Sequence, residues 1–598
     1  MRTMHRTPTI MTTLTAATAF APKLELQHRL FSELSAMFGR EVPLYDKSQL
    51  VNRACNRLVC TLLSRLYLGF TISDAELELT GGERHGAIRI GRPDEYRWIG
   101  RLFGCFAMEP HNYYGMTEVG SKSQPIIATA FRSTMSPEHR IFTSLLMTDY
   151  FDAPTKARID ALLAKRTVFS QRAKELVEKS ERDGGLSNAD GDALIRECTE
   201  RIFKWTGKAS DYALYSELSA SGFKIAADIA CFHSHHLNHL TPNTLCMDLY
   251  TAAMKHCMGE AGASWFEARA RTVLSRLVTH AENDSNRDGL KLRFKHLSAD
   301  EVARYRLGTV GAAEIGRLAA DLTATLAKPE FALTHLKHAG FKDCTEGPSE
   351  DTPVFLRQDA YKALTEPVVF TENDGSTVHS THTARFGEVE ERFYACTPAG
   401  RALYDECLAK ADAAREVDDG LPGHNPANHH RDPHGIAESE ALYARPFAPL
   451  PKTLAGLLAK KFVYARFAPT RAGLAAREAG TITDTDLMSL ADAGLVSYEG
   501  LRYEDFLPVS AAGIFASNLQ QYGTKSTAAV KPSYSQRQLE EVLGRTIIDA
   551  TAVDAGIDAQ SRLATYRALG LLDRVSLAER ATLEAAVTAW VATTGHLR

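Results

Sequence analysis

The fold is read most directly from the stretch His85-Gly86-Ala87-Ile88-Arg89-Ile90. Its alternating, partly β-branched residues predict a strand. Pro93-Asp94-Glu95 then starts a predicted helix, because proline and acidic residues favour the first helical turn, and apolar residues continue it to Phe106. Strand-like sequence returns at 125–131 and at 141–146. These elements account for β-α-β-β, and we expect them to belong to a β-α-β-β-β unit with one further strand.

The chain is too long for one core. Its 598 residues suggest roughly three to five domain-sized units. A hydrophobic content of 44% with 24% charged residues is typical of a soluble globular protein. A net charge of −4 gives no electrostatic reason to expect nucleic acid or an acidic membrane as a partner. No apolar stretch approaches the roughly 20 residues of a membrane-spanning helix.

The ten cysteines include no Cys-x-x-Cys pair, so we expect reduced thiols in an intracellular compartment, cytoplasmic or, in a eukaryote, mitochondrial. Residues 1–24 leave two interpretations open. They lack acids, are rich in Thr and Ala and carry Arg2, Arg6 and Lys23, as a mitochondrial transit peptide does. Because these basic residues are few, an unstructured start is favoured.

The first strand carries two side chains with chemical potential. His85 and Arg89 are four residues apart, so they share a face and lie about 13 Å apart along a strand. A metal on His85 and a carboxylate on Arg89 would bracket a short dicarboxylate, since a guanidinium binds a carboxylate bidentately. The alternative is a surface histidine and a surface arginine at a strand edge.

A second segment, 233–242, is rich in histidine: His233-Ser234-His235-His236-Leu237-Asn238-His239-Leu240-Thr241-Pro242. Alternation along a strand would place His233, His235 and His239 on one face. Common zinc patterns pair histidine with cysteine or space helical histidines by three to five residues. One metal-binding histidine here is therefore sufficient, and a loop of hydrogen-bonded histidines is the alternative.

A third segment, Phe386-Gly387-Glu388-Val389-Glu390-Glu391-Arg392, predicts a strand with Glu388 and Glu390 on the face of Phe386. Acids beside a phenylalanine indicate a half-buried site, and a buried carboxylate needs a cation or a metal. A solvated strand face is the alternative. The spacing does not choose between the two acids.

Two other segments are candidates for ligand binding. Tyr503 to Phe515 mixes Pro, Ser and Gly with apolar residues, which indicates a tight loop whose backbone N–H groups could bind a carboxylate, or plain packing. The region 415–440 is polar and rich in Pro and Gly, so we expect a solvated linker. Its four histidines are His424, His429, His430 and His434. They could bind a metal adventitiously.

Two histidines and one carboxylate from the first three segments form a set that suits mononuclear non-haem Fe(II), because open positions remain for substrate and O₂. In their order, Glu83 to Arg89, Asn238 to Pro242, Phe386 to Glu390 and Tyr503 to Phe515 resemble the 2-oxoadipate dioxygenase/decarboxylase family. The resemblance covers about residues 25–250, 340–410 and 440–525.

The resemblance implies an α+β fold with paired βαβββ modules, similar to vicinal-oxygen-chelate proteins, which form a metal-cupping sheet with large helical insertions. It implies His85, His239 and Glu390 as the catalytic ligands of Fe(II). It also implies that Arg89, Val509 and Ser510 bind the substrate. The chain departs from the family at Asn243 and Cys246, where an Arg and an Asp are usual.

The expected division of the chain is as follows: a disordered or targeting segment, 1–24; N-terminal helices and a first module, 25–150; a helical insertion, 151–225; a second module, 226–254 with 336–412; a further helical insertion, 255–335; a linker, 413–442; a region with the substrate loop, 443–525; and a helical tail, 526–598.

The implied reaction converts 2-oxoadipate and O₂ to (R)-2-hydroxyglutarate and CO₂, a step of lysine breakdown, with no nucleic-acid or membrane partner. One alternative is a related metal-dependent dioxygenase, isomerase or lyase for another 2-oxo acid. A remote alternative is a winged-helix DNA-binding regulator, because Thr397 and Pro398 resemble the cap and first turn of a helix after a wing. The net charge and the lack of a basic recognition helix oppose it.

Overall fold

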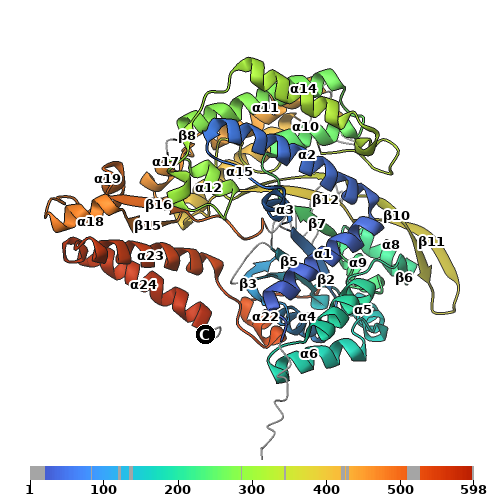
Figure 1. The fold of residues 1–598 in the computed structure, drawn as a ribbon. Coiled ribbons are helices and arrows are strands. Elements are labelled where there is room, and N and C mark those ends of the chain that lie inside the picture. Colours follow the sequence, from blue (N-terminus) through green and yellow to red (C-terminus); the bar gives the residue numbers. More distant parts are fainter. Residues whose placement is uncertain are drawn as a thin grey trace, which may run out of the picture.

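The computed structural model describes residues 20–82, 84–118, 123–133, 139–284, 286–342, 345–418, 424–425, 430–431, 433–507 and 526–595. Val509 and Ser510, the expected substrate loop, lie outside these residues, as do residues 1–19 and the side chains of the four linker histidines. Within the described part, the chain is a mixed α/β protein with many helices and several small sheets (Figure 1).

The central sheet has the expected β-α-β-β-β order, and its β3 is the strand that no predicted segment covers. Its members are β2 (Arg84–Ile90), α4 (Pro93–Gly104), β3 (Met108–Gly115), β4 (Ile126–Ser133) and β5 (His139–Leu146), with β7 (His239–Pro242) added later in the chain. The strands lie in the order β3-β4-β5-β2-β7. β2 pairs in parallel with β5 and antiparallel with β7, so β2 lies between two segments from distant parts of the sequence.

A further strand, β12 (Gly387–Arg392), lies beside β7. It pairs with β9 (Leu356–Tyr361), and a bridge from Asn243 to Glu390 joins it to the end of β7. The Thr244 N–H donates to the Glu390 carbonyl at 2.7 Å. β2, β7 and β12 therefore run past one another, although they come from three separate regions of the chain.

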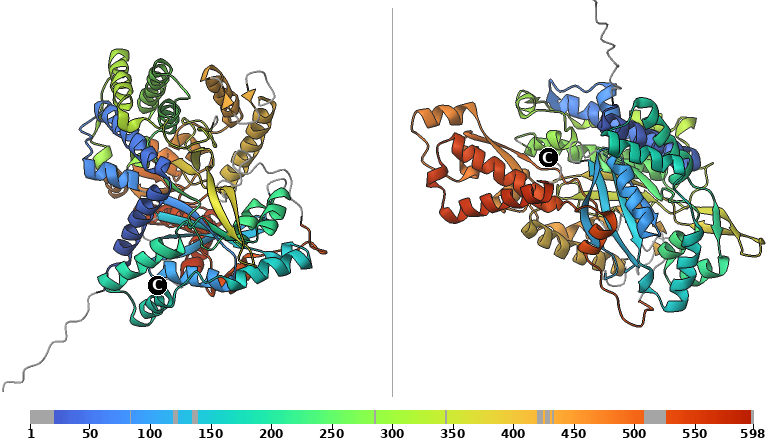
Figure 2. Two further views of the ribbon diagram at one scale, coloured as in Figure 1. Left: turned by 90° about the vertical axis from the view of Figure 1, so that its right-hand side faces the viewer. Right: turned by 90° about the horizontal axis from the view of Figure 1, so that it is seen from below.

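The other strands are short or peripheral. β10 (Thr365–Thr371) and β11 (Thr377–Thr383) form a hairpin that projects from the body of the molecule (Figures 1 and 2) and pairs with β6 (Lys208–Ser210). The remaining pairs are β1 (Tyr67–Leu68) with β8 (Arg306–Leu307), β13 (His424–Asn425) with β14 (His430–Arg431), and β15 (Ala465–Pro469) with β16 (Val496–Gly500).

Helices surround the sheets, and in the described part of the chain the buried apolar side chains form three large clusters and one small cluster. The N-terminal helices are α1 (Lys23–Glu41), α2 (Pro43–Leu66) and α3 (Asp74–Gly82), and the next block is α5 (Ala153–Lys165), α6 (Gln171–Asp183), α7 (Asn188–Glu197), α8 (Tyr212–Ala220) and α9 (Lys224–Cys231). The third block is α10 (Met247–Cys257), α11 (Ala263–Asn283), α12 (Asp288–Arg293), α13 (Ala299–Val302) and α14 (Ala312–Leu326). Helical sequence predicted at 153–225 and 255–335 thus forms helices. α10, α11 and α14 pack on α2 (Figure 1).

The C-terminal helices are α15 (Pro398–Asp418), α16 (Pro433–Ala444), α17 (Leu454–Ala459), α18 (Arg471–Glu478), α19 (Leu487–Asp492), α22 (Gln536–Leu543), α23 (Ala550–Ala568) and α24 (Leu577–Thr594). α15 begins at Pro398, as predicted, and the Thr397 hydroxyl accepts a hydrogen bond from the Gly400 N–H at 3.2 Å. α23 and α24 form a hairpin against β15 (Figure 2). None of the helices in the described residues is long and apolar enough to cross a membrane.

Two sequence-based interpretations of secondary structure were wrong. Lys224 to Cys231, whose sequence predicts a strand or a strand-flanking segment, forms the helix α9. Its residues 225–231 are all buried, so the helix has no polar face that would show helical periodicity. His233 to Asn238 forms no strand, and β7 begins only at His239. Strand alternation therefore does not order these histidines.

Gly387, next to Glu388, is required by close packing. A Cβ atom at this position would collide with the Tyr361 ring on the paired strand β9. We expect Gly387→Ala to lower the free energy of unfolding by about 1–3 kcal/mol, as overpacking does. Urea unfolding measures the effect. Gly81→Ala, where no atom lies within 4 Å of the added Cβ, is the control and should not be destabilised.

Candidate metal centre

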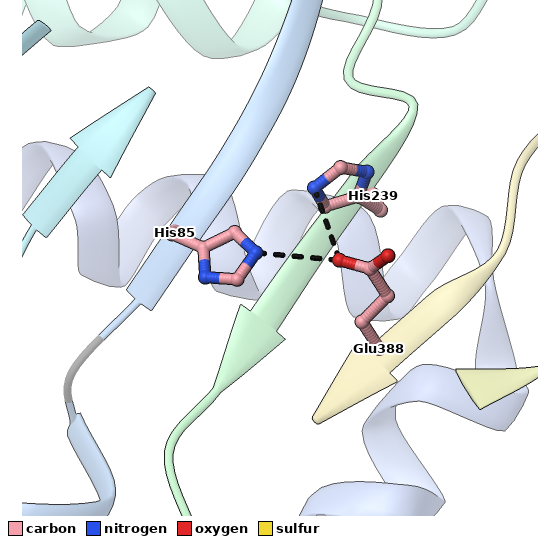
Figure 3. A group of neighbouring side chains, drawn as sticks. All are labelled: His85, His239 and Glu388. Atoms are coloured by element: carbon pink, nitrogen blue, oxygen red, sulfur yellow. Dashed lines mark hydrogen bonds and ion pairs between the residues drawn. The ribbon is translucent and has the colours of Figure 1, made fainter. Parts of the chain in front are cut away.

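Three buried side chains from β2, β7 and β12 converge at one point (Figure 3). His85 Nε2 lies 3.3 Å from Glu388 Oε2, and His239 Nε2 lies 3.4 Å from the same oxygen. Both histidines are fully buried, and Glu388 is 4% exposed. The three candidate ligand atoms all lie within 4.8 Å of one another.

Strand pairing explains the convergence. In the antiparallel pair of β2 and β7, His85 is opposite Thr241 and Ala87 is opposite His239, so the two histidines are diagonal neighbours on one face. The Cβ of any larger residue at Gly86 would lie 3.0 Å from the His239 carbonyl oxygen. Glycine at position 86 therefore lets the two strands approach closely between the histidines.

The polar atoms of this cluster fit a metal ion better than they fit one another. Among the described residues, neither ring nitrogen of His239 has a hydrogen-bond partner, nor does Glu388 Oε1. Buried polar atoms are costly when unpaired. Two ligands about 2.1 Å from a metal lie about 3.0–3.4 Å apart, which is close to the spacings found here. The cluster therefore has the ligand types, burial and spacing of a divalent-metal site.

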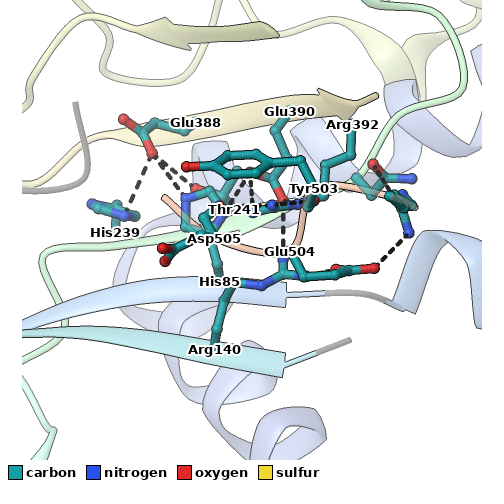
Figure 4. Close-up of polar contacts among 12 residues, drawn as sticks. His85, Arg140, His239, Thr241, Glu388, Glu390, Arg392, Tyr503, Glu504 and Asp505 are labelled. Atoms are coloured by element: carbon teal, nitrogen blue, oxygen red, sulfur yellow. Dashed lines mark hydrogen bonds and ion pairs between the residues drawn. The ribbon is translucent and has the colours of Figure 1, made fainter. Parts of the chain in front are cut away.

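Glu390 lies two residues further along β12, in a different environment (Figure 4). Arg392 donates to both of its oxygens, at 2.6 and 3.0 Å, and Arg140 donates to Oε1 at 3.3 Å. Its Oε2 lies 2.7 Å from Nδ1 of His85, the ring nitrogen that faces away from Glu388. Burial raises the pKa of Glu390, but Arg392, His85 and Arg140 outweigh burial and hold that pKa at about 2.

The two histidines differ in charge preference. Burial lowers the pKa of His239 to about 4, and Glu388 opposes the shift only in part. Burial acts in the same direction on His85, but Glu390 and Glu388 outweigh it and raise the pKa of His85. A neutral His239 presents a lone pair to a metal at neutral pH.

The fourth segment also reaches this site in its described part, Tyr503 to Leu507. Arg392 donates to the carbonyls of Tyr503 and Asp505, at 3.0 and 2.7 Å. Phe506 packs edge-on against His85, with ring centroids 5.0 Å apart. Glu504 accepts from Arg140 at 2.7 Å (Figure 4). The described end of the fourth segment therefore lies beside the candidate metal centre.

Arg89 is buried on the same strand as His85. Its Nη1 donates to Asp228 Oδ2 at 2.5 Å and to Asn238 Oδ1 at 2.7 Å. Asn238 directly precedes His239. The start of β7 therefore contacts Arg89, the expected substrate-binding residue, and also supplies a candidate metal ligand. Asp228 and Asn238 fix the guanidinium in position.

Sequence reasoning missed Arg140, Arg392 and Thr241 as members of the site. Thr241 donates to Glu388 Oε2 at 3.1 Å. Arg140 and Arg392 stand on strands whose residues are all buried, and a charge within a buried strand is the signal that could have marked them.

A mixed α/β fold with a buried set of two histidines and one carboxylate places the chain among proteins that have a possible divalent-metal site. Comparison with known proteins specifies the family. The profile of the 2-oxoadipate dioxygenase/decarboxylase family matches residues 30–263 and 322–518. The chain belongs to this family.

Characterised relatives agree. A 2-oxoadipate dioxygenase/decarboxylase of Pseudomonas putida is 31% identical over 562 residues, which cover 93% of this chain and 99% of the relative. One of Escherichia coli is 28% identical, with 88% of this chain and 94% of the relative covered. The crystal structure of the hydroxyglutarate synthase of P. putida in complex with 2-oxoadipate matches with a TM-score of 0.61 at 29% identity, covering 93% of this chain and all of that one.

Proposed function

We propose that this protein is a 2-oxoadipate dioxygenase/decarboxylase that converts 2-oxoadipate and O₂ to (R)-2-hydroxyglutarate and CO₂ in lysine breakdown. The equation balances, since C₆H₈O₅ plus O₂ equals C₅H₈O₅ plus CO₂. The observation that carries the proposal is the buried cluster of His85, His239 and Glu388 in a chain that belongs to the family of this activity.

We propose His85, His239 and Glu388 as the ligands of Fe(II), with Glu388 in place of the expected Glu390. The revision rests on geometry. Both oxygens of Glu390 face arginines, whereas Glu388 lies at a metal-ligand spacing from both histidines. Sequence spacing alone had left the two acids equivalent.

Glu390 then acts through His85. A carboxylate at the second nitrogen of a metal-binding imidazole fixes the tautomer and the ring orientation. With Glu390 ionised at Nδ1, the Nδ1 proton stays there and Nε2 presents its lone pair to the centre. Arg392 and Arg140 keep Glu390 charged. Phe506 covers the His85 ring and excludes water from that side.

Bound Fe(II) would act as a Lewis acid and template for the 2-oxo acid and O₂. The protein's part is to hold the rest of the substrate. Arg89 is proposed to bind the distal carboxylate, with help from Val509 and Ser510 after the Tyr503–Leu507 segment. Fixing both ends of a dicarboxylate orients its reacting end and selects its length.

Arg89→Ala should raise the KM for 2-oxoadipate about 10- to 100-fold, because a charge-assisted bidentate contact contributes roughly 1.5–3 kcal/mol. The value of kcat should fall much less. Steady-state O₂ uptake against 2-oxoadipate concentration measures both. Arg97→Ala, on the outer side of α4, is a control that should keep the wild-type KM. An unchanged KM in Arg89→Ala would remove Arg89 from substrate binding.

We also propose the finer architecture and the division of the chain given above. β2, α4, β3, β4 and β5 have the βαβββ order of one module, and β7 with β9 to β12 supply the strands of a second. Their adjoining members, β2, β7 and β12, carry the three proposed ligands.

A panel of substrates tests the proposed function. The chain is loaded with Fe(II) anaerobically, and O₂ uptake is measured with 2-oxoglutarate, 2-oxoadipate and 2-oxopimelate. The proposal predicts the highest kcat/KM with 2-oxoadipate. If another 2-oxo acid gave a higher kcat/KM, that acid would replace 2-oxoadipate as the proposed substrate. Asn243 and Cys246, where the chain departs from the usual family sequence, would then be examined first.

A further inference from the structure

A second cluster of possible metal ligands lies on the far side of Arg89 and takes no part in the centre described above. It consists of Asp228 from α9, His236 from the segment before β7, and His382 from β11. Their candidate ligand atoms lie within 4.8 Å of one another. Asp228 is 2% exposed and each histidine is 3% exposed. The histidine-rich segment therefore supplies one residue to each of two clusters.

Hydrogen bonding does not explain how these side chains are arranged. His236 Nε2 lies 3.5 Å from Asp228 Oδ1, and His382 Nε2 lies 3.9 Å from the same oxygen. Neither is a hydrogen bond, since those measure about 2.7–3.2 Å. In the described part of the chain, both nitrogens of His236 and Nε2 of His382 have no hydrogen-bond partner. Three buried imidazole nitrogens are thus left unsatisfied.

A metal ion between them would satisfy two of these nitrogens. Two ligands on one divalent ion lie about 3.0–3.4 Å apart at bond lengths near 2.1 Å, so the two spacings from Asp228 to the histidines need to contract by about 0.1–0.9 Å. Two imidazoles and a carboxylate suit borderline divalent ions such as Zn²⁺ or Fe²⁺ rather than Mg²⁺ or Ca²⁺.

The surroundings hold the rings as the outer partners of a metal site would. The Tyr215 hydroxyl lies 2.8 Å from Nδ1 of His382, which leaves Nε2 for a metal. Trp205 packs edge-on against His236, with centroids 4.6 Å apart, and Phe232 lies 4.6 Å from the His382 ring. Aromatic rings on these sides fix the imidazoles and exclude water.

We propose that Asp228, His236 and His382 bind a second divalent transition-metal ion. Asp228 then shares its carboxylate, with Oδ1 on the ion and Oδ2 on Arg89. The ion would hold Asp228 and, through it, the guanidinium of Arg89. The proposal concerns metal binding alone and does not depend on the reaction proposed above.

Metal counting tests the proposal in a variant whose first centre is disabled. The His239→Ala variant is first stripped of metal with a chelator. It is then dialysed against Zn²⁺ together with a chelator that binds Zn²⁺ with micromolar affinity, and mass spectrometry measures the zinc bound per chain. We expect one equivalent in His239→Ala, none in His239→Ala with His382→Gln, and one in His239→Ala with His379→Gln. His379 is an exposed residue on the same strand and serves as the matched control.

No zinc in His239→Ala, or equal zinc with and without His382, would overturn the proposal. Circular dichroism checks that each variant is folded. Should the His382 variant fail to fold, zinc-edge anomalous diffraction from Zn²⁺-soaked crystals of the unaltered chain decides. A peak between the three side chains supports the site. If zinc fills the first centre and no peak lies between these three side chains, the site is refuted.

Discussion

His239→Ala is expected to lose metal from the first centre and to lower kcat/KM by about 10³-fold or more. The metal supplies several kcal/mol of transition-state stabilisation, and each 1.36 kcal/mol is a factor of ten in rate. His239 is fully buried, and neither of its ring nitrogens has a hydrogen-bond partner among the described residues. Its lone pair is therefore available to a metal. O₂ uptake and iron content measure the two losses.

The control for His239→Ala comes from the same histidine-rich segment. His233 is exposed, and its ring nitrogen Nε2 lies 2.9 Å from the Ser210 hydroxyl. His233→Ala should keep both iron and activity. Wild-type activity in His239→Ala would exclude His239 from the ligand set.

Glu388→Gln and Glu390→Gln are expected to give opposite results. Glu388→Gln should abolish Fe(II) binding and activity, yet change the free energy of unfolding of the metal-free protein by no more than about 1 kcal/mol, because no Arg or Lys among the described residues pairs with Glu388. Glu390→Gln removes the partner of two buried arginines and should cost about 3–5 kcal/mol.

Glu390→Gln should still bind iron, with an affinity reduced about 10- to 100-fold, as expected when the outer partner of a ligating histidine is lost. Iron titration of both variants, beside urea unfolding of their metal-free forms, separates the roles. If Glu390→Gln lost all iron and Glu388→Gln kept it, the ligand assignment would have to be reversed.

The stabilising contribution of Glu390 depends on pH in a defined direction. Its pKa is about 2 in the folded chain and near the ordinary 4.5 when unfolded, so the unfolded state binds more protons between these values. The contribution, roughly 3 kcal/mol by 1.36 kcal/mol per pKa unit, is complete above pH 4.5 and lost as pH falls toward 2. The difference in unfolding free energy between wild type and Glu390→Gln should therefore shrink with acidification over that range.

Local sequence predicted much of the central sheet, because β2, α4, β4 and β5 each carry their own periodicity or start signal. It could not show that β12 lies beside β7, since this contact joins Asn243 to Glu390 across 147 residues. That contact decides which acid faces the histidines. Spacing places Glu388 and Glu390 on one face. In the structure Glu388 lies near both histidines, whereas Arg140 and Arg392 pair with Glu390.

The second cluster was beyond sequence reasoning for a related reason. Asp228 lies on a helix whose sequence predicts a strand or a strand-flanking segment, and His382 lies on a hairpin strand more than 140 residues after His236. The four histidines within seven residues predicted one metal ligand at most, not one ligand for each of two clusters. Instead, His236 and His239 diverge, because the segment between α9 and β7 is irregular and β7 begins only at His239.

We propose that this chain uses iron, held by two histidines and one carboxylate, to oxidise 2-oxoadipate. The most direct test follows dissolved O₂ with an electrode after anaerobic loading of Fe(II), while chiral chromatography identifies the product. We expect the reaction to depend on iron, to consume one molecule of O₂ and to form one molecule of (R)-2-hydroxyglutarate per molecule of 2-oxoadipate. Formation of product without O₂ uptake, or O₂ uptake that is unaffected by removal of iron, would contradict it.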